Sequence, residues 1–120
     1  MRRMHEASVV EALVGMLTKE AALRGGGRIT KIRLVVGEAT GYMAQSLEFY
    51  LGLLGKGTAL EGAGLELRYV KPLLRCGVCS HEFERKRFTF ECPRCGGAGR
   101  LTEAGKEFFV ESIDLEEGVT

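Results

Sequence analysis

The feature that most constrains this sequence is a pair of C-x-x-C motifs, C-G-V-C at residues 76–79 and C-P-R-C at residues 92–95, with twelve residues between them. Two tight turns of this kind can place four thiolates around a zinc ion at about 2.3 Å. Cysteine fills all four positions, so no coordination position is left for water. The spacing therefore predicts a closed, structural zinc site formed by Cys76, Cys79, Cys92 and Cys95.

Two disulfides or an iron site would use the same four cysteines. The first six residues, Met1-Arg2-Arg3-Met4-His5-Glu6, are not followed by an apolar signal-peptide segment, so we expect a cytoplasmic location. Thiols stay reduced there, which favours metal over disulfides. Iron, bound by similar motif pairs in rubredoxin-like proteins, is weakly disfavoured. We interpret His81 as a solvated side chain because four cysteines already complete the site.

The length of 120 residues suits one domain, or one domain with a small appendage. The net charge of +1, from 17 basic and 16 acidic residues, argues against a general nucleic-acid binder. A run of 18 or more apolar residues is absent from the sequence, so we expect no membrane span. The basic run Arg85-Lys86-Arg87 is interpreted as a solvated loop, with a local nucleic-acid contact as the minority alternative.

Apolar spacing predicts two helices, over residues 8–24 and about 43–54. Ser8 and Glu11 fit a capping box at the start of the first helix. The expected apolar stripe of that helix is Val9, Leu13, Met16 and Leu17, and that of the second helix is Met43, Leu47, Tyr50, Leu51 and Leu54.

Alternating apolar residues predict strands over residues 29–37, 65–70 and 107–115. The cysteine segment lies between the last two strands, so we expect an excursion from one edge of an α/β core whose last strand rejoins the sheet. The expected fold class is α/β (α+β), with a small sheet of about three strands, two flanking helices and an inserted four-cysteine zinc-ribbon module. The expected division is a core of residues 1–72 plus 105–120 and a zinc module of residues 73–104.

Five short stretches in order resemble one family, the hydrogenase nickel-incorporation proteins (HypA/HybF-like). They are Met4-His5-Glu6, Val35-Val36-Gly37-Glu38, Gly57-Thr58-Ala59-Leu60-Glu61-Gly62-Ala63, the two C-x-x-C motifs, and Glu111-Ser112-Ile113-Asp114. The resemblance implies a nickel metallochaperone, not an enzyme, that delivers nickel to the large subunit of [NiFe]-hydrogenase with a partner GTPase. Its relatives also serve urease, so urease maturation proteins are further expected partners. We expect no nucleic-acid or membrane partner, and a monomer or homodimer.

The resemblance also implies a nickel site at the N-terminus, within the α/β core. There His5 is the main side-chain ligand to Ni²⁺, with Met4 and Glu6 as main-chain or supporting groups. Imidazole and main-chain nitrogen suit square-planar nickel. Three residues precede the motif, so a chain that begins at Met1 offers an amide rather than the family's terminal amine at Met4. Either Met4 is the true first residue or the site is rearranged.

Two other classes of function are compatible with parts of this sequence. A zinc-ribbon module that binds protein or nucleic acid needs only the four cysteines and no nickel. An enzyme is the weakest hypothesis, because we find no Ser-His-Asp or Cys-His set and no carboxylate pair that would need a catalytic explanation. The glycine-rich segments lack the G-x-x-x-x-G-K-[ST] spacing, so GTP hydrolysis would have to come from a partner.

Overall fold

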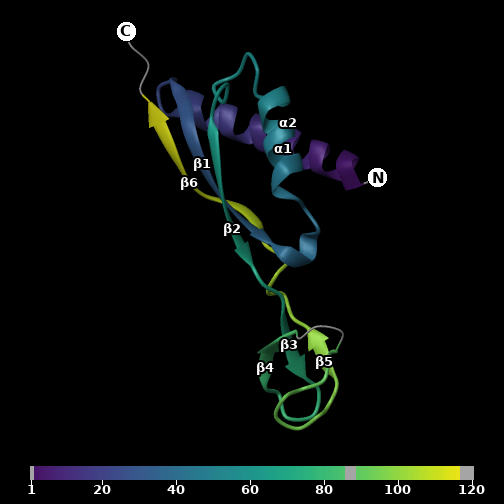
Figure 1. Cartoon of the computed structure of the whole chain (residues 1–120). Coiled ribbons are helices and arrows are strands. Elements are labelled where there is room, and N and C mark those ends of the chain that lie inside the picture. Colours follow the sequence, from purple (N-terminus) through teal and green to yellow (C-terminus); the bar gives the residue numbers. More distant parts are fainter. Residues whose placement is uncertain (1, 86–88, 117–120) are drawn as a thin grey trace. The chain divides into compact units, whose positions relative to one another are not determined.

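The computed structural model describes the backbone of residues 2–85 and 89–116, and the side chains of the same residues from Glu6 onward. Figure 1 shows the order of the elements. They are α1 (Arg2–Leu23), β1 (Arg28–Gly37), a 3-10 turn η1 (Glu38–Thr40), α2 (Ala44–Leu54), β2 (Gly64–Val70), β3 (Leu73–Cys76), β4 (Glu82–Glu84), β5 (Gly99–Leu101) and β6 (Phe108–Glu116).

The larger sheet has the order β2-β1-β6, so the last strand rejoins it as the sequence predicted. β6 runs opposite to β2 in Figure 1, which makes the sheet mixed. The expected fold class, two helices with a small sheet and a separate cysteine segment, is confirmed. The sequence did not indicate which edge the last strand joins: β2 and β6 lie on opposite sides of β1, so the cysteine segment connects the two edges of the sheet.

Helix α1 begins at Arg2, six residues earlier than predicted. Ser8 and Glu11 therefore lie inside the helix, and the predicted capping box was wrong. Residues 2–7 contain neither glycine nor proline, so nothing in them stops the helix from extending upstream. The predicted stripe was correct at Leu13 and Leu17 but not at Met16, which is exposed. The buried apolar side chains of α1 are Val10, Leu13, Val14, Leu17 and Ala21.

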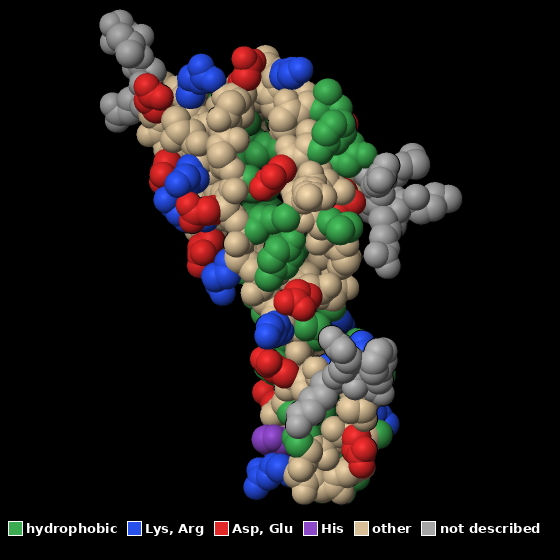
Figure 2. Space-filling view, in the orientation of Figure 1, with side chains coloured by type: hydrophobic (Ala, Val, Ile, Leu, Met, Phe, Trp, Pro, Cys, Tyr) green, Lys and Arg blue, Asp and Glu red, His purple; other side chains and the backbone are tan. Residues whose placement is uncertain are grey.

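Helix α2 packs against α1 and begins after Met43, which is its N-cap residue. Leu47 and Leu51 are buried, as their spacing predicted. Met43, expected in the same stripe, is exposed. On the outward side of α2, Phe49 and Leu53 are exposed, and Figure 2 shows hydrophobic side chains gathered over this helical part of the molecule.

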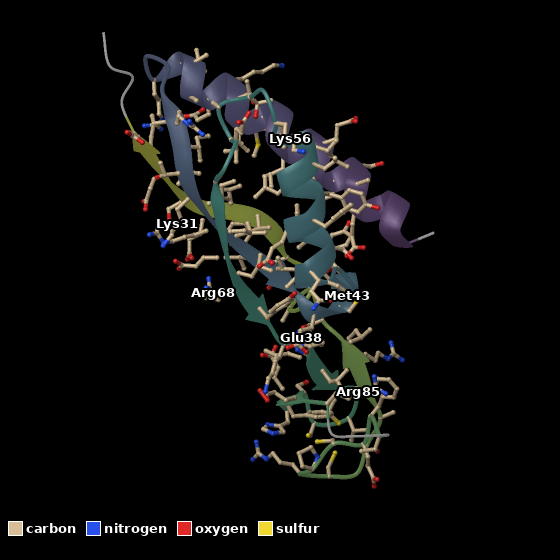
Figure 3. The ribbon with its side chains drawn as sticks, turned by 45° about the horizontal axis from the view of Figure 1, so that its top comes forward. Lys31, Glu38, Met43, Lys56, Arg68 and Arg85 are labelled. Carbon is tan, nitrogen blue, oxygen red and sulfur yellow. The ribbon has the colours of Figure 1, made fainter. Side chains whose placement is uncertain are left out.

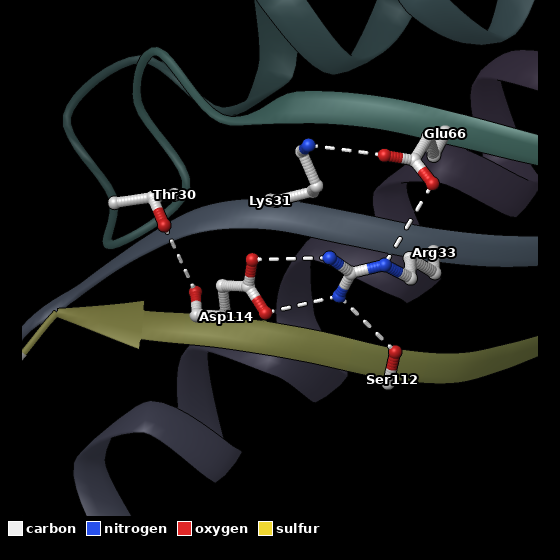
Figure 4. A network of polar contacts seen from close by, with 6 residues as sticks. All are labelled: Thr30, Lys31, Arg33, Glu66, Ser112 and Asp114. Atoms are coloured by element: carbon white, nitrogen blue, oxygen red, sulfur yellow. Dashed lines mark hydrogen bonds and ion pairs between the residues drawn. The ribbon is translucent and has the colours of Figure 1, made fainter.

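Strand β1 buries the alternating side chains of Ile32, Leu34 and Val36, in agreement with the alternation that predicted the strand, and turns Lys31 and Arg33 outward. The Arg33 guanidinium donates two hydrogen bonds to the Asp114 carboxylate on β6, Nη1 to Oδ1 at 2.9 Å and Nη2 to Oδ2 at 3.2 Å. On the other side, Glu66 of β2 lies 3.0 Å from the Lys31 ammonium and 3.7 Å from Arg33 Nε. Figure 4 shows that these pairs link the central strand to both neighbours.

These contacts shift the pKa of each partner. The hydrogen bond from Arg33 lowers the pKa of Asp114 below its ordinary 3.8, and the hydrogen bond from Lys31 lowers the pKa of Glu66 below its ordinary 4.5. The hydrogen bond to Asp114 raises the pKa of Arg33. Both carboxylates are about half exposed, so solvent screens the pairs.

Acid unfolding tests this network. Because the folded-state pKa values of Asp114 and Glu66 are lowered, their stabilising contribution is present above about pH 5 and is lost as the pH falls through the lowered values. Arg33→Gln should therefore reduce the free energy of unfolding at pH 7. Between pH 7 and pH 3 the variant should then lose less stability than the unsubstituted chain. Urea unfolding at both pH values measures this. Lys19→Gln removes an exposed cation from α1 and is the control; an equal loss at both pH values would contradict the role given to Arg33.

A close backbone approach fixes the end of β1. The Gly37 amide donates to the Glu107 carbonyl at 2.7 Å, and the Ala39 amide donates to the Gly105 carbonyl at 2.8 Å. A Cβ on Gly37 would overlap the Gly105 carbonyl group. Gly105 itself has φ of +94°, a conformation that other residues rarely adopt. Both glycines are therefore required by this crossing of two backbones.

Substituting Gly37 should be far more costly than substituting a glycine with free space around it. Gly37→Ala forces the two backbones apart and should destabilise the protein by about 3 kcal/mol, the upper end of the range for overpacked sites. Gly15→Ala, in α1 where a Cβ meets nothing, should stabilise it by about 0.5–1 kcal/mol. Thermal unfolding of both variants measures the difference, and a neutral Gly37→Ala would show that the crossing can relax.

The backbone divides into two compact units. One contains residues up to 34, residues 42–68 and residues from 110 onward; the other contains residues 35–41 and 69–109. The division into functional segments expected from the sequence stays a prediction. Among the described residues, no helix has the length and apolar character needed to cross a membrane.

Candidate metal centre

The cysteine segment forms its own small sheet, with the order β4-β3-β5 and antiparallel pairing. Leu74 of β3 lies opposite Phe83 of β4, and both side chains are buried. The only other members of this buried cluster, among the described residues, are Cys76 and Cys92. Apolar packing and the cysteines therefore share one core.

The two C-x-x-C motifs form matching turns. In the first turn the Ser80 amide donates to the Cys76 carbonyl at 3.1 Å, and in the second the Gly96 amide donates to the Cys92 carbonyl at 2.9 Å. Both donors follow the second cysteine of their motif and have positive φ, +63° at Ser80 and +78° at Gly96. Each turn thus closes over its own sulfur atoms by the same main-chain bond.

The turns bring all four sulfur atoms together, and the yellow sulfur atoms in Figure 3 gather at one place in the cysteine segment. The four Sγ atoms lie within 4.8 Å of one another, with Cys76 and Cys95 at 3.4 Å and Cys79 and Cys92 at 3.7 Å. A tetrahedron with metal–sulfur distances of about 2.3 Å has edges of about 3.8 Å. The cluster therefore has the dimensions of a four-thiolate metal site.

The disulfide alternative is not what the structure shows. All four cysteines are free, and the sulfur separations are well above the roughly 2.05 Å of a disulfide. Cys76 and Cys92 are buried, whereas Cys79 and Cys95 are exposed. One side of the cluster is therefore covered by protein and the other is open to solvent.

Main-chain amides surround the sulfur atoms and alter their acidity. The Cys79 and Val78 amides donate to Cys76 Sγ at 3.4 and 3.3 Å and lower the pKa of Cys76 to about 6. The Gly97 amide lowers the pKa of Cys95, but hydrogen bonds with Cys76 and Cys79 outweigh it and raise that pKa to about 12. The buried sulfur of Cys76 is thus prepared as a thiolate, and a bound cation would release the remaining thiol protons.

His81 lies next to the cluster without joining it, and Arg85 makes a separate contact with an aromatic ring. The His81 ring stacks on Phe83 with ring centroids 6.1 Å apart, and its main-chain carbonyl accepts from the Cys76 amide at 2.9 Å. Among the described residues, the group of side chains that could bind a metal ion contains the four cysteines and not His81. Arg85 lies 4.6 Å above the centre of the Phe90 ring, while Lys86 and Arg87, the rest of the basic run, are outside the described residues.

The predicted nickel ligands lie at the start of α1. Met4 and His5 are in its first turn, and their side chains are outside the described part of the chain. Glu6 is buried, with 2% of its surface exposed, and its Oε2 accepts a hydrogen bond from the Met43 amide at 2.7 Å. Sequence reasoning missed this contact, which joins residues 37 positions apart. The nickel ligand set stays a prediction.

The positive φ of Ser80 generates a prediction about the first turn. An L-residue with a side chain adopts this conformation at a cost of about 1–2 kcal/mol, whereas glycine does not. Ser80→Gly should therefore stabilise the cysteine segment by about 0.5–1 kcal/mol, and Gly96→Ala, at the equivalent position, should destabilise it by about 1 kcal/mol. Amide hydrogen exchange within residues 73–85 and 89–104 measures both. Shifts of the same sign would contradict the equivalence of the turns.

Comparison with known proteins shows which family has this sequence and architecture. The family model described as "Hydrogenase/urease nickel incorporation, metallochaperone, hypA" matches residues 4–115. The hydrogenase maturation factor HypA of Caldanaerobacter subterraneus subsp. tengcongensis is 46% identical over 114 residues, which cover 94% of this chain and 100% of that protein. The corresponding factor of Geobacter sp. is 36% identical over 113 residues, covering 94% and 100%.

Solved structures show the same fold. The solution structure of a HypA protein matches with a TM-score of 0.71 and 22% identity, over 96% of this chain and 98% of that one. The solution structure of the nickel metallochaperone HypA from Helicobacter pylori matches with a TM-score of 0.62 and 20% identity, over 94% and 98%. With the family model spanning both C-x-x-C motifs and the N-terminal Met-His-Glu, the chain belongs to the HypA family of hydrogenase and urease nickel-incorporation metallochaperones.

Proposed function

We propose that this chain is a nickel metallochaperone for the maturation of [NiFe]-hydrogenase, with a resident zinc ion in the cysteine cluster and nickel as transient cargo at the N-terminus. The observation that carries the proposal is the family match over residues 4–115, which begins at the Met-His-Glu motif and takes in all four cysteines. Nearly complete coverage of relatives that are themselves hydrogenase maturation factors supports the same function.

The donor set of the cysteine cluster fits zinc. Cys76, Cys79, Cys92 and Cys95 would hold the ion, and four soft thiolates leave no position for a reacting molecule. The amides of Val78 and Cys79, which donate to Cys76 Sγ, would offset the negative charge of the thiolates. The role of zinc here would be structural, since it would join the two turns into one folded module. Iron prefers the same four-sulfur geometry, so metal analysis has to distinguish the two ions.

Nickel would bind at a site of different chemistry. His5 supplies an imidazole, and the Met4 amide lies in the first turn of α1, where main-chain amides have no acceptor within the helix. Nitrogen donors of this kind suit square-planar Ni²⁺, and the thiolates of the two C-x-x-C motifs would already hold zinc. A site at the end of a helix can also release its ion, which a carrier has to do. We place Glu6 beside the nickel site in a supporting role.

The remaining parts of the function follow from the same family membership. The partners would be the GTPase of hydrogenase maturation, which hydrolyses GTP where this chain has no phosphate loop, and the hydrogenase large subunit as recipient. Urease maturation proteins are a second group of partners. The protein would act in the cytoplasm and catalyse no reaction itself. The alternative, a zinc-ribbon binding module without nickel, has no observation that favours it over the family match.

Substitution of His5 tests the nickel site. His5→Ala should reduce nickel binding to background, because the main side-chain donor is lost, and should leave the zinc content unchanged. Equilibrium dialysis with elemental analysis of the purified full chain measures both metals together. His81→Ala, which removes the other histidine of the sequence, is the control and should still bind nickel. Nickel bound at the cysteines regardless of His5 would contradict the proposal.

Substitution of Cys92 tests the proposed zinc site. Cys92→Ala removes one of four ligands and a member of the small buried cluster, so the cysteine segment should lose zinc and unfold. The sheet β2-β1-β6 and its helices should persist because they bury their own apolar side chains. Hydrogen exchange by segment, together with metal analysis, measures this. A Cys92→Ala protein with full zinc and a protected segment would rule out the four-cysteine site.

A further inference from the structure

We infer that Glu6 is a positioning residue for the N-terminal nickel site: its buried carboxylate anchors the first turns of α1, which carry His5, to the start of α2. The inference rests on the proposed nickel function, because it concerns the geometry of that site. It assigns to the Glu6 side chain a structural bond rather than a bond to nickel.

The burial of Glu6 requires an explanation. Among the residues whose side chains are described, Glu6 is the one buried polar or charged residue, with 2% of its surface exposed. A buried carboxylate is unfavourable unless a hydrogen bond or an opposite charge compensates it. The Met43 amide provides this compensation, donating to Glu6 Oε2 at 2.7 Å. That length lies at the short end of the range for N–H···O hydrogen bonds.

The start of α2 also lacks what Glu6 supplies. Its N-cap residue, Met43, makes no side-chain capping bond, and no acidic residue stands in its first turn. The first amides of a helix have no acceptor within the helix, and a nearby side-chain oxygen can accept from one of them. Figure 3 shows Met43 at this end of α2. Glu6 therefore provides from α1 the hydrogen-bond acceptor that the start of α2 does not contain.

The anchor has a consequence for nickel. Glu6 directly follows His5, at the beginning of the second turn of α1, so its bond to Met43 holds the turn that carries Met4 and His5. Helix ends fray unless something holds them, and a frayed end has to be ordered before it can bind a metal ion. Because Oε2 is used by Met43, Glu6 acts on nickel through the main chain to which it is attached.

Two substitutions at Glu6 separate positioning from ligation. In Glu6→Gln the side-chain carbonyl oxygen can still accept from Met43, so nickel affinity should stay within about threefold of the unsubstituted chain. Glu6→Ala removes the acceptor and should weaken nickel binding by about tenfold or more. Zinc content should not change in either. Glu11→Ala removes an exposed carboxylate from the same helix and is the matched control, with unchanged nickel affinity.

Hydrogen exchange of the Met43 amide gives a readout that needs no nickel. It should be slow in the unsubstituted chain and in Glu6→Gln, and faster in Glu6→Ala. If the unsubstituted chain binds no nickel, the proposed function fails, and this exchange still decides whether Glu6 anchors the helix. Equal weakening by Gln and Ala would overturn the inference, because the charge or a direct bond to nickel would then matter. Unchanged affinity in Glu6→Ala would overturn it as well.

A backbone substitution covers the case in which Glu6→Ala fails to fold. Replacing the amide between residues 42 and 43 by an ester, with the α-hydroxy analogue of methionine at position 43, removes the donor and keeps both side chains. Nickel affinity should fall to the extent that Glu6→Ala is expected to show. An ester protein with the affinity of the unsubstituted chain would show that the Met43 bond does not position the site.

Discussion

The fold of the cysteine segment depends on the four thiols being held together, because little else is available to order it. Its buried cluster contains Leu74 and Phe83 and the two thiol residues Cys76 and Cys92. Burying one large apolar side chain contributes about 1.5–3 kcal/mol, whereas ordering each residue of a segment costs about 1–2 kcal/mol. A metal held by four cysteines in a small domain contributes about 10–16 kcal/mol. A metal ion bound at the proposed four-cysteine site would therefore supply most of the free energy that orders the segment.

The other unit is stabilised by ordinary burial. Helices α1 and α2 pack together, and the part of the central strand β1 that belongs to this unit buries Ile29, Ile32 and Leu34. Its outward face carries the Arg33 and Lys31 pairs, which are partly exposed and bind neighbouring strands in register more than they add stability. The two units thus depend on different forces, so loss of a thiol ligand need not unfold the sheet with its helices.

The elements that could be predicted were those encoded locally. Alternation located β1, β2 and β6, and motif spacing alone predicted that four distant cysteines would meet. Features set by tertiary approach could not be predicted. No residue before Ser8 marks where α1 begins, so its start could not be located from the sequence. The cysteine segment connects opposite edges of the sheet because of the strand order, which the sequence does not show. The contact of Glu6 with Met43 has no sequence pattern, because it requires two helix starts to meet.

The proposed assignment of two metals gives this separation a chemical meaning. Thiolates bind nickel as well as zinc, and Cys79 and Cys95 are exposed. Without a bound zinc ion, the two C-x-x-C motifs would therefore compete with the N-terminal site for nickel. A resident ion that occupies all four sulfur atoms removes that competition. Nickel is then left with nitrogen donors at a helix end, where binding depends on how well that end is held. In such a protein the structural metal and the Glu6 anchor would serve one purpose, since both direct the cargo to a site from which it can be transferred.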